Sequence, residues 1–419
     1  MDPVQVQRRH QERGDGRVPD MTSGPQSSSK LGAQRTEQRP LRVAFVASSY
    51  NYIRDGVALT LNRLVAYLEQ QGVEVLVFAP VGKLPAFVHA GTVVPVPSVS
   101  LPARPEYRLA FGLHGQALER LRAFRPDIIH IALAPDILGH SALKAARRLR
   151  VPVVASYHTR FETYLKHYWY VAGLTSLVRH YLRRSYGMCR EVYVPSQSMV
   201  DALLADGFRN NFRLWPRGVD TALFNPGKRS SQWRAKHGIG ESELVVVFVS
   251  RLVREKRLDT LAAALRLLEA RGIAHRSVIV GDGPERAALE RQLPHAVFTG
   301  FLEGEALAEA YASSDIFVFP SETETFGNVT LEAMASGLPC VCADATGSRS
   351  LVVPGRTGSL AKPGCAEEFA DHIAALAHDP QLRRQMGADA RERSLGFSWD
   401  QTMARIHGYY KSLLAETSA

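Results

Sequence analysis

The stretch that decides the fold is residues 315–342, which read DIFVFPSETETFGNVTLEAMASGLPCVC. Its two ends, Asp315–Pro320 and Leu338–Cys342, are short apolar runs typical of buried strands. The segment between them contains LEAMA at residues 331–335, which is typical of a helix. A strand, a helix and a second strand in this order predict a right-handed crossover and a parallel sheet covered on both faces.

The same alternation occurs along the chain in two sets. The apolar runs of the first set are Leu41–Ala47, Val73–Ala79, Asp127–Ile131, Val151–Ser156 and Glu191–Pro195, with helical spacing at residues 57–70, 110–124, 137–149 and 197–205. The apolar runs of the second set are Leu244–Ser250, Ser277–Gly281, Ala296–Thr299, Asp315–Pro320 and Leu338–Cys342. Two such sets predict an α/β protein with two doubly wound halves.

The composition changes mark the predicted domain boundaries. Residues 1–40 are polar, which predicts a disordered tail without the apolar core of a signal peptide, and Met21 is an alternative start. The first half spans residues 41–218 and the second 219–398, because Pro, Gly, Lys and Ser gather at residues 218–236. A last helix is expected over residues 399–419.

The composition also excludes several classes of protein. The chain has 419 residues, 45% of them hydrophobic and 22% charged, which excludes a collagen, a coiled-coil rod and a mostly disordered chain. No run reaches the ~18 apolar residues of a transmembrane helix. Cys340 and Cys342 lie in an apolar run, which favours a buried strand in a reducing cytoplasm over a zinc site.

Positive charge gathers in one region of the chain. Residues 141–217 carry nine more Lys and Arg than Asp and Glu, out of a net charge of +10 for the whole chain. Within this region, residues 160–190 interleave basic and aromatic side chains, which is typical of a helix at a membrane surface. A solvated basic face and a core helix are the alternatives. The predicted acceptor and membrane residues are Tyr164, Tyr168, Trp169, Tyr170, Arg179, Arg183 and Arg184.

Polar motifs follow several of the predicted strands, where ligands bind in open parallel sheets. Gly56 opens the helix after the first strand, and a glycine there lets backbone N–H groups approach an anion. Arg251 and Lys256 follow the strand that starts the second half, and together they can clamp a diphosphate. Gly281 begins a Gly-Asp-Gly-Pro turn after another strand. The alternatives are a flexible loop with a helix cap for Gly56, ordinary surface cations for Arg251 and Lys256, and a tight turn for Gly281.

The most informative motif is the pair Glu324 and Glu332, eight residues apart around a predicted helix N-terminus. The free N–H groups near Gly327–Val329 can face an anion. Glu324, in the loop, can accept hydrogen bonds from sugar hydroxyls. Glu332, two turns on from Glu324 and inside an otherwise apolar helix, can reach a ribose diol.

Taken together, these motifs resemble the family-4 retaining glycosyltransferases of the GT-B fold over residues 41–415. The likeness is carried by the Glu324 and Glu332 run with its Phe-Gly-Asn context, by Ser-Arg-Leu at residues 250–252, by Gly-Asp-Gly-Pro at 281–284 and by Arg-Gly-Val-Asp at 217–220. Asp-Gly-Val at 55–57 and Ser-Tyr-His-Thr at 156–159 resemble a glycolipid-forming branch. That branch includes GDP-mannose-dependent mannosyltransferases and the glucuronosyl- and sulfoquinovosyl-diacylglycerol synthases.

The resemblance implies a fold and a set of site residues. Residues 41–218 would be the Rossmann-like acceptor domain and 219–398 the Rossmann-like nucleotide-sugar domain across a cleft, with the last helix crossing back to the first. His158, Glu324, Arg251 and Lys256 would be catalytic, with His158 near the reacting sugar. The donor would be bound by Gly56, Arg251, Lys256, Gly281, Glu324, Phe326, Gly327, Asn328, Val329 and Glu332.

The resemblance also implies an activity. The enzyme would move a hexose with retention from GDP-mannose, a UDP-hexose or UDP-glucuronate to a membrane lipid. The chain has no Asp-x-Asp, so we expect no metal, and we expect no cofactor and no nucleic acid partner. The expected location is the cytoplasm, peripheral on the inner face of the plasma membrane. The donor sugar, its base, the lipid and the oligomeric state stay open.

Two positions depart from the family pattern, and other functions stay as alternatives. Asp55 stands where many members have a second glycine, and Arg349 and Ser350 stand in a stretch that usually ends in an acid. A soluble transferase acting on a saccharide is one alternative. An NAD-dependent oxidoreductase is disfavoured by the incomplete glycine fingerprint. A nucleic-acid-binding protein is disfavoured by the lack of a groove-reading motif.

Overall fold

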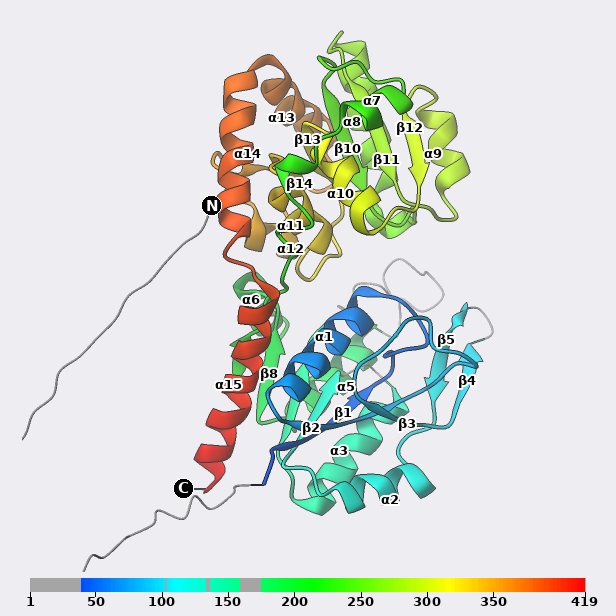
Figure 1. Cartoon of the computed structure of the whole chain (residues 1–419), viewed down its shortest axis with the longest axis vertical. Coiled ribbons are helices and arrows are strands. Elements are labelled where there is room, and N and C mark those ends of the chain that lie inside the picture. The colour runs from blue at the N-terminus through cyan, green and yellow to red at the C-terminus, as the bar shows by residue number, and fades with distance from the viewer. Residues whose placement is uncertain (1–38, 102–103, 133–135, 159–174, 419) are drawn as a thin grey trace, which may run out of the picture. The chain divides into compact units, whose positions relative to one another are not determined.

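The computed structural model describes residues 39–101, 104–132, 136–158 and 175–418. Residues 40–419 form one compact unit, and their strands build two large parallel sheets and one small hairpin (Figure 1). The predicted α/β class with two doubly wound halves is therefore confirmed.

The first sheet has the strand order β3-β2-β1-β6-β7-β8-β9, and all its neighbours pair in parallel. The order reverses direction at β1, so the crossovers on either side of β1 place helices on opposite faces. Its strands are β1 Arg42–Ala47, β2 Glu74–Ala79, β3 Thr92–Pro95, β6 Ile128–Ala132, β7 Val153–Ser156, β8 Glu191–Val194 and β9 Phe212–Leu214.

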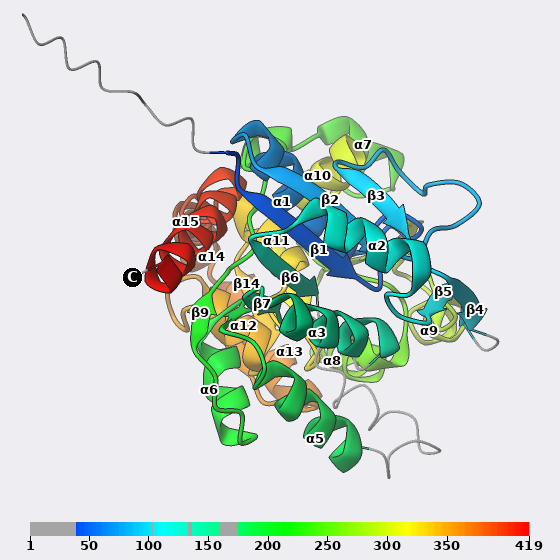
Figure 2. The same ribbon diagram turned by 90° about the horizontal axis from the view of Figure 1, so that it is seen from below.

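Helices cover both faces of the first sheet, each over its own apolar core. One core is shared with α2 (Gly115–Phe124), α3 (Ile137–Leu149), α5 (Thr175–Tyr186) and α6 (Gln197–Ala205). The other core is shared with α1 (Gly56–Gln70) and α15 (Trp399–Ser418). Figure 2 shows α2, α3, α5 and α6 along one side of this sheet and α1 on the other.

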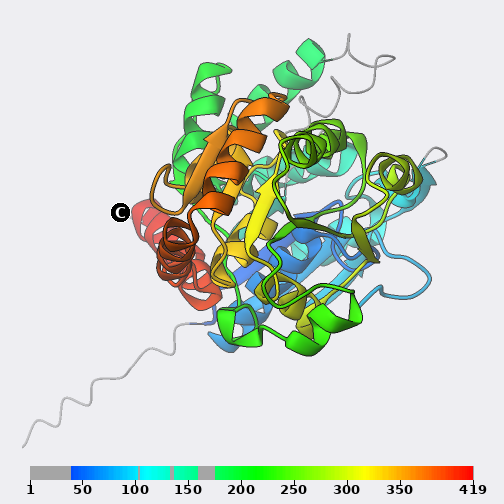
Figure 3. The ribbon, with the colours of Figure 1, turned by 90° about the horizontal axis from the view of Figure 1, so that it is seen from above.

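The second sheet has the order β12-β11-β10-β13-β14-β15 and is also parallel. Its strands are β10 Val245–Val249, β11 Arg276–Val280, β12 Val297–Gly300, β13 Ile316–Phe319, β14 Cys340–Ala343 and β15 Gly358–Ala361. Helices flank these strands on both sides (Figure 3). They are α7 Ser231–Lys236, α8 Leu258–Ala270, α9 Arg286–Gln292, α10 Gly304–Ala312, α11 Asn328–Ala335, α12 Thr346–Leu351, α13 Ala366–His378 and α14 Pro380–Ser394.

The helix predicted over residues 110–124 is wrong at its start. Ala110 ends β5 (Arg104–Ala110), which forms an antiparallel hairpin with β4 (Ser98–Leu101), and α2 begins only at Gly115. Gly112 has a φ of +104°, which lets the chain turn between β5 and α2. The short edge strands β3, β9 and β15 were also not predicted. β9 is only half-buried along its length, so it lacks the continuous apolar run of a central strand.

The chain passes twice between the two sheets, and the two passages lie side by side. The amide of Val219 donates a hydrogen bond of 2.9 Å to the carbonyl of Phe397. A Cβ on Gly218 would come within 2.6 Å of the Trp399 ring, so only glycine fits there. Beyond Trp399, α15 packs along α1, and a hydrogen bond of 2.5 Å joins Tyr410 to His130 on β6. The domain boundaries at residues 40, 218 and 398 stay predictions.

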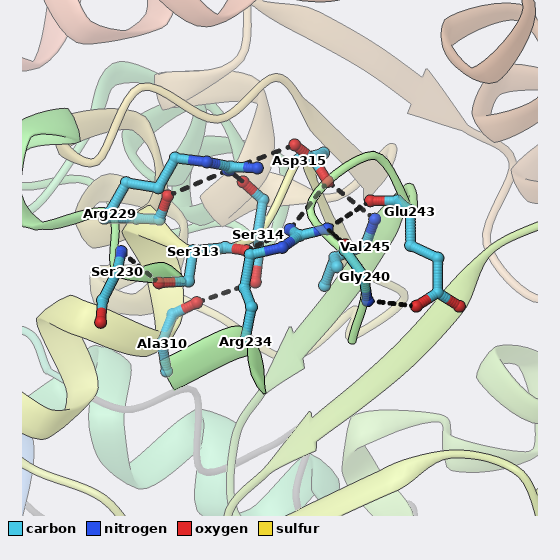
Figure 4. A network of polar contacts seen from close by, with 11 residues as sticks. Arg229, Ser230, Arg234, Gly240, Glu243, Val245, Ala310, Ser313, Ser314 and Asp315 are labelled. Carbon is cyan, nitrogen blue, oxygen red and sulfur yellow. Dashed lines mark hydrogen bonds and ion pairs between the residues drawn. The ribbon is translucent and has the colours of Figure 1, made fainter. Parts of the chain in front are cut away.

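A buried arginine joins the two loops that lead into β10 and β13 of the second sheet (Figure 4). The Arg234 side chain, on α7, is fully buried. It donates hydrogen bonds to the carbonyls of Ser313 at 2.8 Å, Gly240 at 2.6 Å and Glu243 at 2.5 Å. It also lies 3.5 Å from the Asp315 carboxylate. One side chain therefore satisfies three backbone acceptors from the two loops that lead into β10 and β13.

We expect Arg234→Met to lower the free energy of unfolding by about 3–5 kcal/mol, because it leaves three buried carbonyls and a carboxylate short of a partner. Equilibrium unfolding in urea measures this change. Arg229→Ala is the matched control, since Arg229 meets the same Asp315 at 3.4 Å but is 39% exposed. That variant should change stability by less than about 1 kcal/mol. Equal effects of the two variants would contradict the role of Arg234.

Candidate active site

The loop between β13 and α11 carries the Glu324 motif to the carboxyl edge of the second sheet. The helix α11 begins at Asn328, directly after Gly327, whose φ of +102° favours glycine. No side chain caps this N-terminus. Its first N–H groups are therefore open to an anion, and the predicted contact of Gly327–Val329 with an anion stays a prediction.

Lys256 and Glu324 meet in this loop region. Lys256 ends the short 3₁₀ helix η3 (Arg254–Lys256), and its Nζ contacts Oε1 of Glu324. The Lys256 side chain is only 9% exposed, and its Nζ also lies 5.8 Å from the centroid of the Phe319 ring. An ammonium group carries three donors, so Nζ keeps N–H groups for a second acceptor such as a phosphate. The structure thus brings together two residues that are 68 positions apart in the sequence.

Arg251 and Gly281 lie at neighbouring strand ends. Arg251 follows β10 and is exposed, and its side chain has no hydrogen bond or ion pair to the other described residues. Gly281 has a φ of +132°, and a Cβ on it would lie 1.9 Å from the carbonyl oxygen of Ser250. Gly281 therefore lets the loops after β10 and β11 pack backbone to backbone. Its contact with a donor stays a prediction.

Glu332 lies on α11 with two partners that the sequence did not predict. Tyr311 donates a hydrogen bond of 3.3 Å to Glu332 Oε2. Burial raises the pKa of Glu332 to about 7, while this hydrogen bond and the charge of Arg63 oppose the rise. Arg63 comes from α1, and its Cζ lies 4.3 Å from the centroid of the Trp399 ring. No local pattern marks Arg63 or Tyr311, because each reaches Glu332 only through the tertiary fold.

The N-termini of α1 and α11 approach each other. Asp55 caps α1 by accepting a hydrogen bond of 2.8 Å from the amide of Ala58. A Cβ on Gly56 would lie 3.7 Å from Nδ2 of Asn328, the first residue of α11. The first residues of the two helices therefore lie close together, and both helix N-termini carry partial positive charge. This geometry suits a bound diphosphate, and the aspartate that departs from the family pattern serves as a helix cap.

His158 follows β7, and both of its ring nitrogens already have partners. Nδ1 lies 2.6 Å from a guanidinium nitrogen of Arg217, and Nε2 lies 2.7 Å from Oγ of Ser156. Burial, followed by the charges of Arg217 and His130, holds the pKa of His158 well below its ordinary value. The His158 carbonyl accepts a hydrogen bond of 3.0 Å from Thr325, beside Glu324. The predicted catalytic role of His158 stays a prediction.

The other departures from the family pattern also have structural partners. Arg349 pairs with Asp344 at 2.5 Å. The Ser350 hydroxyl lies 2.7 Å from the hydroxyl of Ser198, which comes from α6 beside the first sheet. Gly347 packs against the backbone of Glu324, where a Cβ would lie 2.9 Å from the carbonyl oxygen. This stretch therefore packs against the loop that carries Glu324.

The predicted acceptor and membrane residues fall into two groups. Tyr164, Tyr168, Trp169 and Tyr170 lie outside the described residues. Arg179, Arg183 and Arg184 lie on α5, where Arg183 and Arg184 are exposed. Among the helices that the structure describes, none has the length and apolar character needed to cross a bilayer. Within the same described ranges, no group of three or more His, Cys, Asp or Glu side chains is arranged to hold a metal ion.

Comparison with known families settles the identity of this arrangement. The profile "Glycosyltransferase Family 4" matches residues 54–223, and the profile "Glycosyl transferases group 1" matches residues 229–393. A GDP-mannose-dependent alpha-mannosyltransferase of Mycobacterium tuberculosis is 38% identical over 382 residues, which cover 89% of this chain and 97% of the relative. The chain belongs to the family-4 glycosyltransferases. The predicted family and the predicted enzyme class, a hexosyltransferase, are therefore confirmed.

Two further relatives and one solved structure are similar to this chain. Sulfoquinovosyl transferase SQD2 of Arabidopsis thaliana is 35% identical and covers 88% of this chain and 73% of its own length. Alpha-monoglucosyldiacylglycerol synthase of Streptococcus pneumoniae is 28% identical, with 72% of this chain and 70% of the relative covered. The sucrose-phosphate synthase of Thermosynechococcus elongatus shares the fold at a TM-score of 0.70 and 21% identity, over 90% of this chain and 100% of that one.

The raised pKa of Glu332 predicts a pH dependence of stability for this glycosyltransferase. The folded protein holds the Glu332 proton more tightly than the unfolded chain, so ionisation destabilises the fold as the pH rises through about 7. Between about pH 5 and pH 8 the wild type should lose about 1–3 kcal/mol relative to Glu332→Gln. Urea unfolding across this range measures the difference.

Glu269→Gln is the control for that experiment, because Glu269 is exposed at the C-terminal end of α8. It should follow the wild type at every pH. A Glu332→Gln curve parallel to the wild type would contradict a buried, proton-retaining Glu332.

Proposed function

We propose that this chain transfers a hexose from a nucleotide sugar to a membrane lipid, with retention of the anomeric configuration and without a metal ion or cofactor. The observation that carries the proposal is the contact of Lys256 with Glu324 beside the uncapped N-terminus of α11. A buried ammonium group, a carboxylate and backbone N–H groups that are open to an anion lie close together here. These are the groups that a sugar diphosphate needs.

Breaking the anomeric C–O bond of a nucleotide sugar places negative charge on the diphosphate and positive charge on the sugar. Lys256, the exposed Arg251 and the two facing helix N-termini supply preformed positive charge for the leaving group. Glu324 is placed to accept hydrogen bonds from the sugar hydroxyls, and Glu332 from the ribose. The backbone from Phe326 to Val329 would line the phosphates.

Retention follows in the proposal from attack on the same face that the diphosphate leaves. No side chain is assigned as a nucleophile. The acceptor hydroxyl attacks the anomeric carbon as the bond to the diphosphate breaks, and the departing phosphate oxygen takes the hydroxyl proton. The His158 carbonyl accepts a hydrogen bond from Thr325, so His158 lies beside the loop that carries Glu324. With both ring nitrogens engaged, its contribution in this proposal is to shape the sugar pocket.

The lipid acceptor is supported by the names of relatives and by the charge of α2, α3 and α5. The Streptococcus pneumoniae relative is named alpha-monoglucosyldiacylglycerol synthase. In this chain, α2, α3 and α5 pack on one face of the first sheet. A pocket of about 220 Å³ between α2 and α3 is lined by Arg122, Lys144 and Arg148, and none of its lining residues is acidic. Together with Arg183 and Arg184, these cations suit an anionic membrane surface.

We place the reaction at the cytoplasmic face of the plasma membrane. All four cysteines are unpaired, and Cys340 and Cys342 are buried in β14. Free thiols are typical of a reducing compartment, which supports this location.

The transfer test uses purified full-length protein with GDP-mannose, UDP-glucose, UDP-galactose or UDP-glucuronate, vesicles containing diacylglycerol and anionic lipid, and EDTA. Label from one donor should enter the lipid phase. Lys256→Ala removes a positive charge beside the diphosphate, and Glu324→Gln removes the carboxylate that would accept the sugar hydroxyls. Each should lower kcat/KM by about 10²–10³-fold. Lys236→Ala, on the exposed face of α7, is the control and should retain activity.

The outcomes of the transfer test separate the alternatives. Label in a saccharide acceptor but not in lipid would support a soluble glycosyltransferase. A strict requirement for a divalent cation would contradict the metal-independent mechanism. An inverted anomeric configuration in the product, measured by NMR, would contradict retention.

Binding to anionic vesicles tests the membrane surface. Replacing Arg179, Arg183 and Arg184 by Ser should weaken binding to phosphatidylglycerol vesicles by about tenfold or more, because each cation near the surface contributes ~1 kcal/mol. Binding should also fall with added salt. The control replaces Lys236, Arg266 and Arg384 by Ser, which removes the same charge from exposed sites around the second sheet. Equal losses in both triple variants would contradict a defined membrane face.

A further inference from the structure

A buried arginine without a carboxylate partner lies between the two sheets in the chain. Arg217 is 6% exposed, and the described residues include no ion pair to it. Its Cζ lies 5.0 Å from the centroid of the Trp215 ring. Its Nη1 is buried without a hydrogen-bond partner, and Nη2 lies 2.6 Å from Nδ1 of His158. Keeping a charge buried in this way is costly.

The contact fixes the protonation state of His158. A guanidinium can only donate hydrogen bonds, so Nδ1 of His158 must accept. The ring is then neutral with its hydrogen on Nε2, which donates to Oγ of Ser156 at 2.7 Å. Arg217 and Ser156 together hold the ring in one tautomer and one orientation.

The backbone of His158 passes this constraint to the sugar loop. The Thr325 hydroxyl donates to the His158 carbonyl at 3.0 Å, and Thr325 is adjacent to Glu324. Arg217 itself precedes Gly218 and Val219, where the two passages between the sheets lie side by side. A continuous set of contacts therefore runs from the two passages between the sheets through Arg217 and His158 to the loop that carries Glu324.

We propose that Arg217 is a positioning residue that sets the sugar-binding loop through His158. In this role it affects the binding and transfer of the donor sugar and leaves the nucleotide contacts at α11 unchanged. The identity of the ligand rests on the proposed function, whereas the control of His158 by Arg217 does not.

The charged and titratable groups around His158 define what the loss of Arg217 should do. Arg217 comes from the crossing segment and His130 from β6, where its Nδ1 is bound to Tyr410. Among the residues that the structure describes, Trp215, Ser156 and Thr325 also contact His158 and carry no charge. Removing the Arg217 charge raises the pKa of His158, although burial still holds it below the ordinary value.

The first test compares Arg217→Met with Arg217→Lys. Arg217→Met should weaken nucleotide-sugar binding and lower kcat/KM by about 10- to 100-fold, since a displaced sugar loop loses its reactive geometry. Binding of free GDP or UDP should stay within about twofold, and Arg217→Lys should recover part of the loss. An equal loss of free nucleotide and nucleotide sugar would overturn the proposal, because general destabilisation has that effect.

A double-mutant cycle tests the route through Thr325. Thr325→Val removes the hydroxyl that donates to His158 and keeps the shape of the side chain. If Arg217 acts through His158, the double variant Arg217→Met with Thr325→Val should be little worse than either single variant. Fully additive effects would overturn the route.

A spectroscopic test does not depend on activity. In protein labelled with ¹⁵N in its histidines, the His158 signal is the one that disappears in His158→Asn. The wild type should show a neutral Nε2–H ring from about pH 6 to pH 8. In Arg217→Met the signal should show mixed tautomers and titrate at a higher pH. A wild-type His158 that titrates near pH 6.5, or carries its hydrogen on Nδ1, overturns the proposal even if no sugar is transferred.

Discussion

The candidate site depends above all on the contact between Lys256 and Glu324. The two residues follow β10 and β13, which are neighbours in the second sheet, so their loops leave the same edge side by side. The contact neutralises a buried ammonium group, which would otherwise be costly to keep in the protein. It also fixes Glu324 beside the N-terminus of α11. The loop is therefore set before any ligand arrives, which is the preorganisation that electrostatic catalysis requires.

Around that contact, elements of both sheets contribute to one place. The N-terminus of α1 faces the N-terminus of α11, Arg63 of α1 is coupled to Glu332, and His158 binds Thr325 through its carbonyl. Each contact joins a residue near the first sheet to a residue near the second. The family-4 assignment gives the class of enzyme to which this site belongs. It leaves open how the position of one half is conveyed to the other, and Arg217 offers a physical route.

Much of this could be predicted from local sequence, and the rest could not for physical reasons. The strand–helix alternation fixed the two parallel sheets, because buried parallel strands form continuous apolar runs. Glu324, Glu332 and Lys256 were recognisable because each lies after a strand or at a helix start. The roles of Arg217, named only within the Arg-Gly-Val-Asp motif, and of Arg63 were not, since their partners are 59 and more residues away and are set only by packing. The helix start at Gly115 was missed because the turn at Gly112 follows an unpredicted hairpin.

The most direct test of the central claim is a titration of nucleotide sugar into the full-length protein in EDTA, comparing wild type with Lys256→Ala by calorimetry. The account predicts that the wild type binds a donor without metal and that the variant binds it at least about tenfold more weakly, through loss of the diphosphate contact. Equal binding by both proteins, or binding by the wild type only when a divalent cation is supplied, would contradict the account.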